Sequence, residues 1–163
     1  MFIIRPATIN DLPSITEIYN DAILNTTATF DTEIKSIEQQ KVWFANHGKL
    51  HPIRVAEENK KIVGWASLSE WSERCAYDTT VEVSVYVKRE FRGKGIGKKL
   101  LEAVTIAGEQ VGVHTILSRI TEGNEISIHI HEALGYKHVG VMKEVGKKFG
   151  RYLDVYMMQK VFF

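Results

Sequence analysis

The segment Arg92–Lys98 combines glycines and cations in a way that suits the binding of a phosphate. Gly93, Gly95 and Gly97 occupy every second position, and an apolar pattern typical of a helix starts at Ile96. Where a glycine turn meets the start of a helix, free backbone N–H groups and the positive end of the helix dipole converge. Glycine also allows the backbone to approach a phosphate without a Cβ in between. The candidate anion-binding residues are therefore Arg92, Gly93, Lys94, Gly95, Ile96, Gly97 and Lys98.

The spacing of these glycines differs from two familiar phosphate-binding motifs. A Walker-type loop requires Gly-x4-Gly-Lys-Ser/Thr, but the stretch from Gly93 to Gly97 is too short, and Lys99 stands where the hydroxyl residue should be. A dinucleotide fingerprint requires Gly-x-Gly-x-x-Gly and an acidic residue after the next strand, and the predicted strand Val113–Ile120 ends without one. Both of these nucleotide-binding classes are therefore disfavoured.

The segment before the glycines, Thr80–Val87, carries a candidate general base. Valine alternates there with other residues, which is the period-two pattern of a strand with two unlike faces. Glu82 lies on the face opposite the valines, toward the side that a bound ligand would occupy. A carboxylate in that position could take a proton directly or through a water molecule. The alternative interpretation is a solvated or ion-paired strand glutamate.

The combination of valine strand, glycine turn and helix resembles the central motif of the GNAT superfamily of N-acetyltransferases. The motif, Val-x-Val-x4-Arg-Gly-x-Gly-Ile-Gly, runs here from Val85 to Gly97. The segment Asn124–Tyr136 is similar to the superfamily's second cofactor segment, so the resemblance covers essentially the whole chain. A finer match, in Arg74–Glu82 and Arg151–Val155, is to the phosphinothricin and methionine sulfoximine acetyltransferases, which acetylate small amino-acid-like amines.

This resemblance implies that acetyl-CoA is the co-substrate and that its diphosphate lies on the glycine segment. The pantetheine arm would pair with backbone groups of Val85, Tyr86 and Val87, and the Val85 N–H would polarise the thioester carbonyl. Asn124 and Ser127 would contact the same arm. Asn124 could also act as an ordinary N-cap of the helix that follows, and both roles are compatible.

The resemblance leaves the role of His131 open. Many superfamily members have a tyrosine at this position that protonates the departing sulfur, whereas the phosphinothricin-type branch has a histidine. His131 would either donate that proton or contact the cofactor or substrate. The histidines lack convincing metal-ligand spacing, so no metal site is predicted. Cys75 is disfavoured as an acetyl-carrying nucleophile because no histidine is near it in sequence, and direct attack in a ternary complex needs no such intermediate.

Arg74 is the best candidate to bind a carboxylate of the acceptor, because a guanidinium can contact a carboxylate through two hydrogen bonds. Phe30, Trp71, Tyr77 and Tyr86 could line a small pocket, although ordinary packing is the commoner role for any one of them. Phe30 lies where the resembling enzymes have a substrate loop. The predicted substrate is the α-amine of a small amino acid or analogue, with Glu82 as base. A protein or peptide amine, and a CoA-binding module without catalysis, remain alternatives.

The composition is that of an ordinary folded chain. Its 163 residues fit a single domain spanning 1–163, with 44% hydrophobic and 25% charged residues. The formal net charge of +1 provides no global field that would favour nucleic acid or an anionic membrane as a partner. Cys75 is the only cysteine, which excludes an internal disulfide. We therefore expect a cytoplasmic protein, and the resemblance suggests a homodimer.

Hydrophobic periodicity and turn residues predict the elements that position these groups. The predicted strands are Phe2–Arg5, Pro52–Ala56, Ile62–Leu68, Thr80–Val87, Val113–Ile120, Tyr136–Val141 and Arg151–Val161. The predicted helices run from Leu12 to Ile23, from Ser36 (as N-cap) to before Gly48, from Gly95 to about Gly108 with an end before Gly112, and from Asn124 to Leu134. Since helices and strands do not alternate strictly, we expect an α/β protein of the α+β type, with a single mixed, mostly antiparallel sheet and helices on both faces. The resemblance adds a GNAT-like acyl-CoA N-acyltransferase fold whose central strands splay to admit the cofactor arm.

Overall fold

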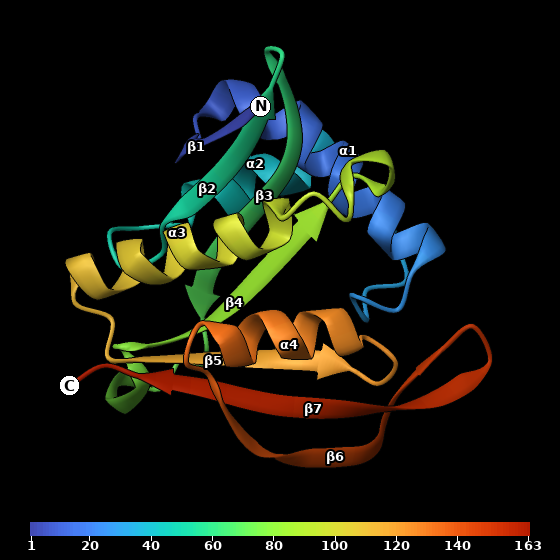
Figure 1. Ribbon diagram of the computed structural model, residues 1–163, viewed down its shortest axis with the longest axis vertical. Coiled ribbons are helices and arrows are strands. Elements are labelled where there is room, and N and C mark those ends of the chain that lie inside the picture. The colour runs from blue at the N-terminus through green and yellow to red at the C-terminus, as the bar shows by residue number, and fades with distance from the viewer.

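Strand β4 (Thr80–Val87) forms at its predicted position and lies in the middle of a seven-stranded sheet (Figure 1). The computed structural model describes residues 1–163. The strand order is β1-β2-β3-β4-β5-β7-β6. The other strands are β1 (Phe2–Pro6), β2 (Ile53–Glu58), β3 (Lys61–Glu70), β5 (Thr115–Thr121), β6 (Lys137–Lys148) and β7 (Arg151–Val161). Only the β4–β5 pair is parallel, so the prediction of a mixed, mostly antiparallel sheet is confirmed.

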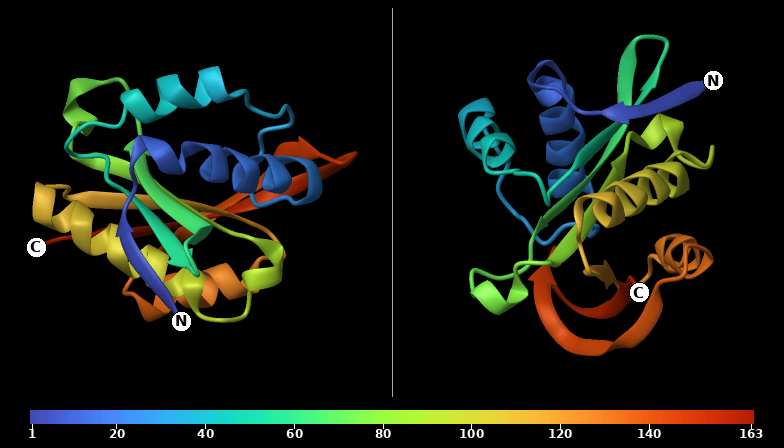
Figure 2. Two further views of the ribbon diagram at one scale, coloured as in Figure 1. Left: turned by 90° about the horizontal axis from the view of Figure 1, so that it is seen from above. Right: turned by 90° about the vertical axis from the view of Figure 1, so that its left-hand side faces the viewer.

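Four α-helices cover the two faces of this sheet, as predicted. They are α1 (Leu12–Asn25), α2 (Ile37–Ala45), α3 (Ile96–Val111) and α4 (Glu125–Ala133). In the right panel of Figure 2, α1 and α2 lie on one side of the sheet, and α3 and α4 lie on the other. The larger core is formed between the sheet and α3, where Leu100 and Val104 are fully buried. No helix is both long and apolar enough to cross a membrane.

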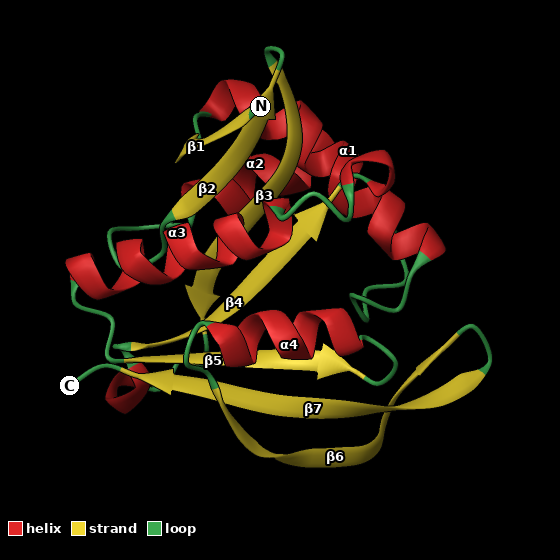
Figure 3. Ribbon diagram, viewed as in Figure 1, coloured by secondary structure: helices red, strands yellow, loops and turns green.

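The central strands β4 and β5 stay together for only a short distance. Their parallel register covers Thr80–Glu82 on β4 and Thr115–Leu117 on β5. Beyond these residues the two strands diverge, as Figure 3 shows for the yellow arrows of β4 and β5. The splayed centre expected from the resemblance is therefore present, and it opens at the strand that carries Glu82.

The helix α3 ends before Gly112, as its sequence pattern predicts. It continues past Gly108 to Val111, and its C-cap is Gly112, which has a φ of 99°. A glycine C-cap with positive φ is a common helix terminator. Gly108 has a packing role instead, since a Cβ there would lie 2.5 Å from the Leu68 side chain of β3. The glycine lets the helix approach the sheet closely.

The strand β6 is also longer than predicted, reaching Lys148 rather than ending at Val141. Glycines and charged residues hide its second half in the sequence. Its register with β7 shifts between Met142 and Gly146, which marks an irregularity that a simple alternation pattern misses. Pairing with β7, which spans the predicted range, maintains the longer strand.

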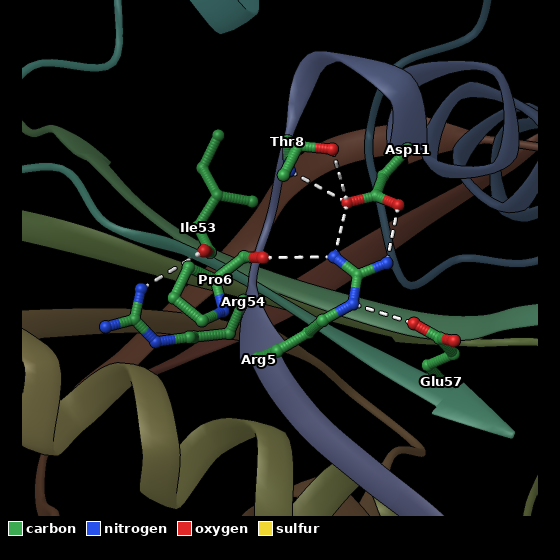
Figure 4. A network of polar contacts seen from close by, with 7 residues as sticks. All are labelled: Arg5, Pro6, Thr8, Asp11, Ile53, Arg54 and Glu57. Carbon is green, nitrogen blue, oxygen red and sulfur yellow. Dashed lines mark hydrogen bonds and ion pairs between the residues drawn. The ribbon is translucent and has the colours of Figure 1, made fainter. Parts of the chain in front are cut away.

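A charged network at the end of β1 fixes the connection to α1 (Figure 4). Arg5 donates through Nη1 and Nη2 to the two carboxylate oxygens of Asp11, at 2.8 Å each, and through Nε to Glu57 on β2 at 2.7 Å. The backbone N–H of Thr8 also donates to Asp11, at 2.8 Å. Hydrogen bonds from Arg5 hold the pKa of the Asp11 carboxyl below its ordinary value, because they favour the ionised form.

We predict that Asp11→Asn lowers the free energy of unfolding at pH 7 by about 1.5–3 kcal/mol, the usual contribution of a hydrogen bond to a charged group. A lowered folded-state pKa contributes stability that is complete above the ordinary value of about 4 and is lost as the pH falls through the folded-state pKa. The free energies of unfolding of wild type and variant, measured by denaturant titration, should therefore converge as the pH is lowered. Asp78→Asn, on an exposed turn, is the control. A gap between wild type and Asp11→Asn that stays constant down to pH 3 would contradict this assignment.

Candidate active site

The free edge of β4 presents backbone donors to the gap beside it. The N–H of Lys88 donates to Val63 O of β3 at 2.8 Å, and the β3–β4 register is continuous up to Val87. Because successive N–H groups of a strand point to opposite edges, those of Val85 and Val87 point away from β3. The β5 register ends at Glu82, so these two donors face the space between the diverging strands.

The glycine segment follows directly and leads into α3. Gly93 and Gly95 have φ angles of 78° and 80°, which L-residues rarely adopt. A Cβ at either position would meet nothing within 4 Å, so these two glycines are required by their backbone conformation. Gly95 is the N-cap of α3 and has no side chain to satisfy the first N–H groups of the helix. Those donors are available to an anion.

Two adjoining cavities occupy the splay between β4 and β5. The larger, about 650 Å³, follows the glycine segment and the start of α3. The smaller, about 480 Å³, is lined by Glu82, Phe30 and Arg119 among others. The residues that line both cavities mark the place where a ligand bound in one cavity would contact a ligand bound in the other. These shared residues are Ala28, Val85, Tyr86, Asn124, Ser127 and His131.

The Glu82 carboxylate lies in the smaller cavity and is paired with Arg119 of β5. Arg119 donates to Glu82 through Nε and, at 2.6 Å, through Nη2. The register explains the contact: Glu82 is opposite Leu117, and Arg119 lies two residues further along the same face of β5. The ring of Trp71 lies 5.3 Å from the Arg119 guanidinium, and the hydrogen bonds to Glu82 raise the pKa of Arg119.

The segment between α1 and α2 forms one wall of the smaller cavity. Thr121 of β5 donates to Thr27 O at 2.7 Å, and the buried Lys148 of β6 donates to Thr29 O at 2.8 Å. Burial lowers the pKa of Lys148. The Phe30 ring rests on Gly146 of β6, where a Cβ would lie 2.1 Å from the ring. The loop is thus attached to strands that come much later in the chain, through hydrogen bonds that span 94 and 119 residues.

Two further polar side chains complete that wall. Tyr19 of α1 donates to Asp31, and its hydroxyl lies 3.0 Å from Thr29 Oγ1. Burial raises the pKa of the Tyr19 hydroxyl, so it remains a neutral donor. Asp31 therefore brings a second carboxylate to the cavity that already contains Glu82.

His131 is buried at the junction of the two cavities. Its Nδ1 lies 2.7 Å from the carbonyl oxygen of Ser127, and its Nε2 lies 2.9 Å from Ser118 Oγ. A carbonyl can only accept, so Nδ1 carries the proton and the Ser118 hydroxyl donates to Nε2 of the neutral ring. Burial lowers the pKa of His131, which favours this neutral form at pH 7.

The structure separates the predicted site residues into groups. All the predicted cofactor-binding residues except Lys94, whose ammonium lies over Phe91, line the larger cavity. Phe30 and Glu82 line the smaller one. Trp71, Arg74 and Tyr77 line neither cavity, although Trp71 supports Arg119. Asn124 is the N-cap of α4, accepting from the N–H of Ser127 at 3.2 Å, and also lines both cavities.

Several residues of this site were missed by the sequence reasoning. Arg119 is the most important, followed by Ser118, Asp31 and Lys148. The available signal for Arg119 was a lone cation within the predicted strand Val113–Ile120, which is otherwise mostly apolar. Its partner could not be identified without the register of β5 against β4. Cys75 is exposed on the turn before β4 and lines neither cavity.

Comparison with known proteins assigns this chain to one family. Residues 4–157 match the family described as an Acetyltransferase (GNAT) domain. The L-methionine sulfoximine/L-methionine sulfone acetyltransferase of Pseudomonas aeruginosa is 40% identical over 158 residues, covering 96% of this chain and 92% of that protein.

Solved structures agree with the sequence comparison. A phosphinothricin acetyltransferase from Sinorhizobium meliloti, solved in complex with acetyl-CoA, is 37% identical with a TM-score of 0.94, covering 98% of this chain and 88% of that chain. A ribosomal-protein-alanine N-acetyltransferase from Brucella melitensis is also 37% identical with a TM-score of 0.94, covering 98% of this chain and 99% of that chain.

We predict that Gly146→Ala displaces Phe30, because the added methyl group would overlap the ring. Overpacking of this kind lowers the free energy of unfolding by about 1–3 kcal/mol, and here the ring can leave instead of the strand moving. The measurement is hydrogen exchange of the Asp31 amide, which is bonded to Thr29 Oγ1 at 3.1 Å and should exchange faster in the variant. Gly140→Ala is the matched control on β6, since a Cβ there meets nothing within 4 Å. Unchanged Asp31 exchange in Gly146→Ala would contradict the role of this glycine.

Proposed function

Because this chain belongs to the GNAT acetyltransferase family and is an acetyl-CoA-dependent N-acetyltransferase, we propose which amine it acetylates. The proposed acceptor is the α-amine of a small amino acid or amino-acid analogue. The observation that carries the proposal is the junction of the two cavities beside Glu82. One cavity suits a long ligand with a phosphate, and the other suits a small acceptor. The named relatives that act on methionine sulfoximine and phosphinothricin support the same substrate class.

The residues around the larger cavity fit acetyl-CoA. Uncapped N–H groups at the start of α3 suit its diphosphate. The Val87 N–H suits an amide of the pantetheine arm, and the Val85 N–H suits the thioester oxygen, where charge develops during transfer. Arg92 donates to Val87 O at 3.2 Å, which orders the turn between the strand and the glycines. When bound, acetyl-CoA supplies an acetyl group activated as a thioester.

Transfer is proposed to occur by direct attack in a ternary complex. The amine nitrogen bonds to the acetyl carbon, the carbon–sulfur bond breaks, and CoA leaves as a thiolate. Glu82 takes the proton that the amine must lose, directly or through water. The alternative route through an acetylated Cys75 is disfavoured, because that thiol is exposed and lies outside both cavities.

The role of His131 follows from its hydrogen bonds. A neutral ring that donates through Nδ1 has no proton at Nε2 to give to a thiolate. We therefore propose that His131 orients the Ser118 hydroxyl and fills the junction, and that it does not protonate the departing sulfur. Its edge-on contact with Tyr136, at 4.9 Å between ring centres, helps to fix the ring.

A protein or peptide amine is a second candidate acceptor. The similarity to the ribosomal-protein-alanine N-acetyltransferase of Brucella melitensis favours it. Peptides with an N-terminal alanine therefore belong in the same assay as the amino acids. A CoA-binding module without catalysis is the least supported alternative, because the family and the named relatives are acetyltransferases.

We predict that acetyl-CoA and either L-methionine sulfoximine or phosphinothricin yield free CoA, measured as thiol release. Glu82→Gln should lower kcat by about 10²–10⁴-fold, the usual contribution of a general base. The loss should be greatest at neutral pH, where the amine is mostly protonated. Glutamine keeps the shape of the side chain, so acetyl-CoA affinity should not change.

The matched control for this variant is Glu109→Gln, on the exposed end of α3. A wild-type rate for Glu82→Gln at neutral pH would refute Glu82 as the base. Failure to release CoA with any amino acid or analogue, together with turnover of N-terminal alanine peptides, would refute the substrate class and favour the second candidate.

We further propose a homodimer that uses the outer face of β6, in a protein located in the cytoplasm. β6 is an edge strand, and its Val139 and Val141 are 57% and 44% exposed. Apolar side chains on an open edge favour association with another chain. The unpaired thiol of Cys75 is compatible with a reducing compartment.

We predict that Val141→Lys converts the dimer into a monomer, because a charge in an apolar interface remains without a partner. Size-exclusion chromatography with light scattering measures the mass directly. Ile3→Lys on β1, the opposite edge strand, is the control, since Ile3 is 58% exposed. A monomeric wild type, or a dimer that tolerates Val141→Lys and not Ile3→Lys, would refute this interface.

A further inference from the structure

The acceptor cavity contains one guanidinium, and it belongs to Arg119 instead of the expected Arg74. Arg74 lies at the start of an exposed turn and lines neither cavity. Arg119 lines the smaller cavity with 51% of its side chain exposed, so a ligand can reach it. The charged group available to recognise an acceptor is therefore on β5.

Arg119 retains hydrogen-bonding capacity after it has paired with Glu82. The pair uses Nε and Nη2, and Nη1 makes no hydrogen bond to another part of the protein. A guanidinium has five N–H donors in a rigid plane, and a second acceptor can approach along the free side of that plane. The Trp71 ring, 5.3 Å away, restricts the guanidinium to this orientation.

We propose that the Glu82–Arg119 pair recognises the zwitterion of a free amino acid, with Arg119 binding its α-carboxylate. The ammonium and carboxylate of an α-amino acid are attached to the same carbon and so present adjacent opposite charges. The paired side chains carry the complementary charges: the Glu82 carboxylate can bind the ammonium, and the Arg119 guanidinium can bind the carboxylate. An acceptor whose carboxylate faces Arg119 therefore has its amine at Glu82. This inference rests on the proposed function and makes Arg119 a specificity-determining residue.

The same arrangement distinguishes between the two candidate acceptors. The N-terminal residue of a protein or peptide has an amide on its α-carbon in place of a carboxylate, so it offers Arg119 a neutral acceptor. A carboxylate adds a charge–charge attraction to its hydrogen bond with the guanidinium, and a neutral amide oxygen adds none. Asp31 adds a second negative charge to the cavity and, like Glu82, favours the ammonium group of either acceptor. Arg119 is therefore the charged group that distinguishes a free amino acid from a peptide.

The test compares each amino acid with its own α-carboxamide. In wild type and in Arg119→Met, kcat/KM is measured for L-methionine sulfone and for L-methionine sulfone amide. Removing the guanidinium also leaves Glu82 without its partner, and that effect is common to both acceptors. Taking the ratio of acid to amide cancels this common effect. Comparing the ratio between wild type and variant then cancels the difference in amine basicity between the two acceptors. We expect Arg119→Met to lower this ratio by about 10–100-fold, mainly through KM. Arg119→Lys, which keeps the charge and loses the planar fork, should restore part of the ratio.

Two controls make the result specific. Lys41→Met removes the cation of an exposed residue on α2 and should leave the acid-to-amide ratio unchanged. Thermal unfolding and acetyl-CoA binding show whether Arg119→Met remains folded.

An equal loss of kcat/KM for acid and amide would overturn the inference, because Arg119 would then only position Glu82. A selective loss in Arg74→Met, with none in Arg119→Met, would overturn it in favour of Arg74. If wild type acetylates peptides and neither of these acceptors, the proposed function fails and the inference fails with it.

Discussion

The parting of β4 from β5 is the constraint on which the rest of the site depends. Parallel pairing ends at Glu82 and Leu117, and the strands separate over the residues that would otherwise continue the ladder. Buried backbone groups without partners are costly, so a sheet opened at its centre requires water or a ligand to satisfy them. A ligand that carries amides along its length can replace the missing strand. The gap therefore selects an extended, amide-bearing molecule, and its closed end places the Glu82 side chain beside the end of that molecule.

The opening also explains why the acceptor wall is assembled from distant parts of the chain. The loop after α1 has no regular structure of its own and is held by Thr121 of β5 and Lys148 of β6. Gly146 then allows the Phe30 ring to lie against β6. Because β6 continues well past its predicted end, it reaches the far side of the cavity, so the extra length of this strand contributes to the site.

Local features of the sequence predicted much of the fold, and contacts between distant segments account for what was missed. The valine alternation, the glycine turn and the Ser36 cap each depend on neighbouring residues, and each forms as expected. The end of α3 was predicted only between about Gly108 and Gly112. The packing role of Gly108 was missed, because the side chain that requires a glycine there, Leu68, lies 40 positions earlier. Arg119 was missed for the same reason, because its contact with Glu82 depends on the register between two strands that are distant in sequence. Sequence reasoning found the carboxylate but not the cation that accompanies it.

The pairing of Glu82 with Arg119 also determines where the two charges of an acceptor would lie. Arg119 uses Nε and Nη2 on Glu82, so Nη1 is the donor that remains for a carboxylate. In the proposed arrangement, an acceptor whose carboxylate binds at Nη1 brings its amine beside Glu82. An amide-terminated acceptor has an ammonium for Glu82 but no negative charge for Arg119. Binding and orientation of a free amino acid would then depend on the same two side chains, one on β4 and one on β5.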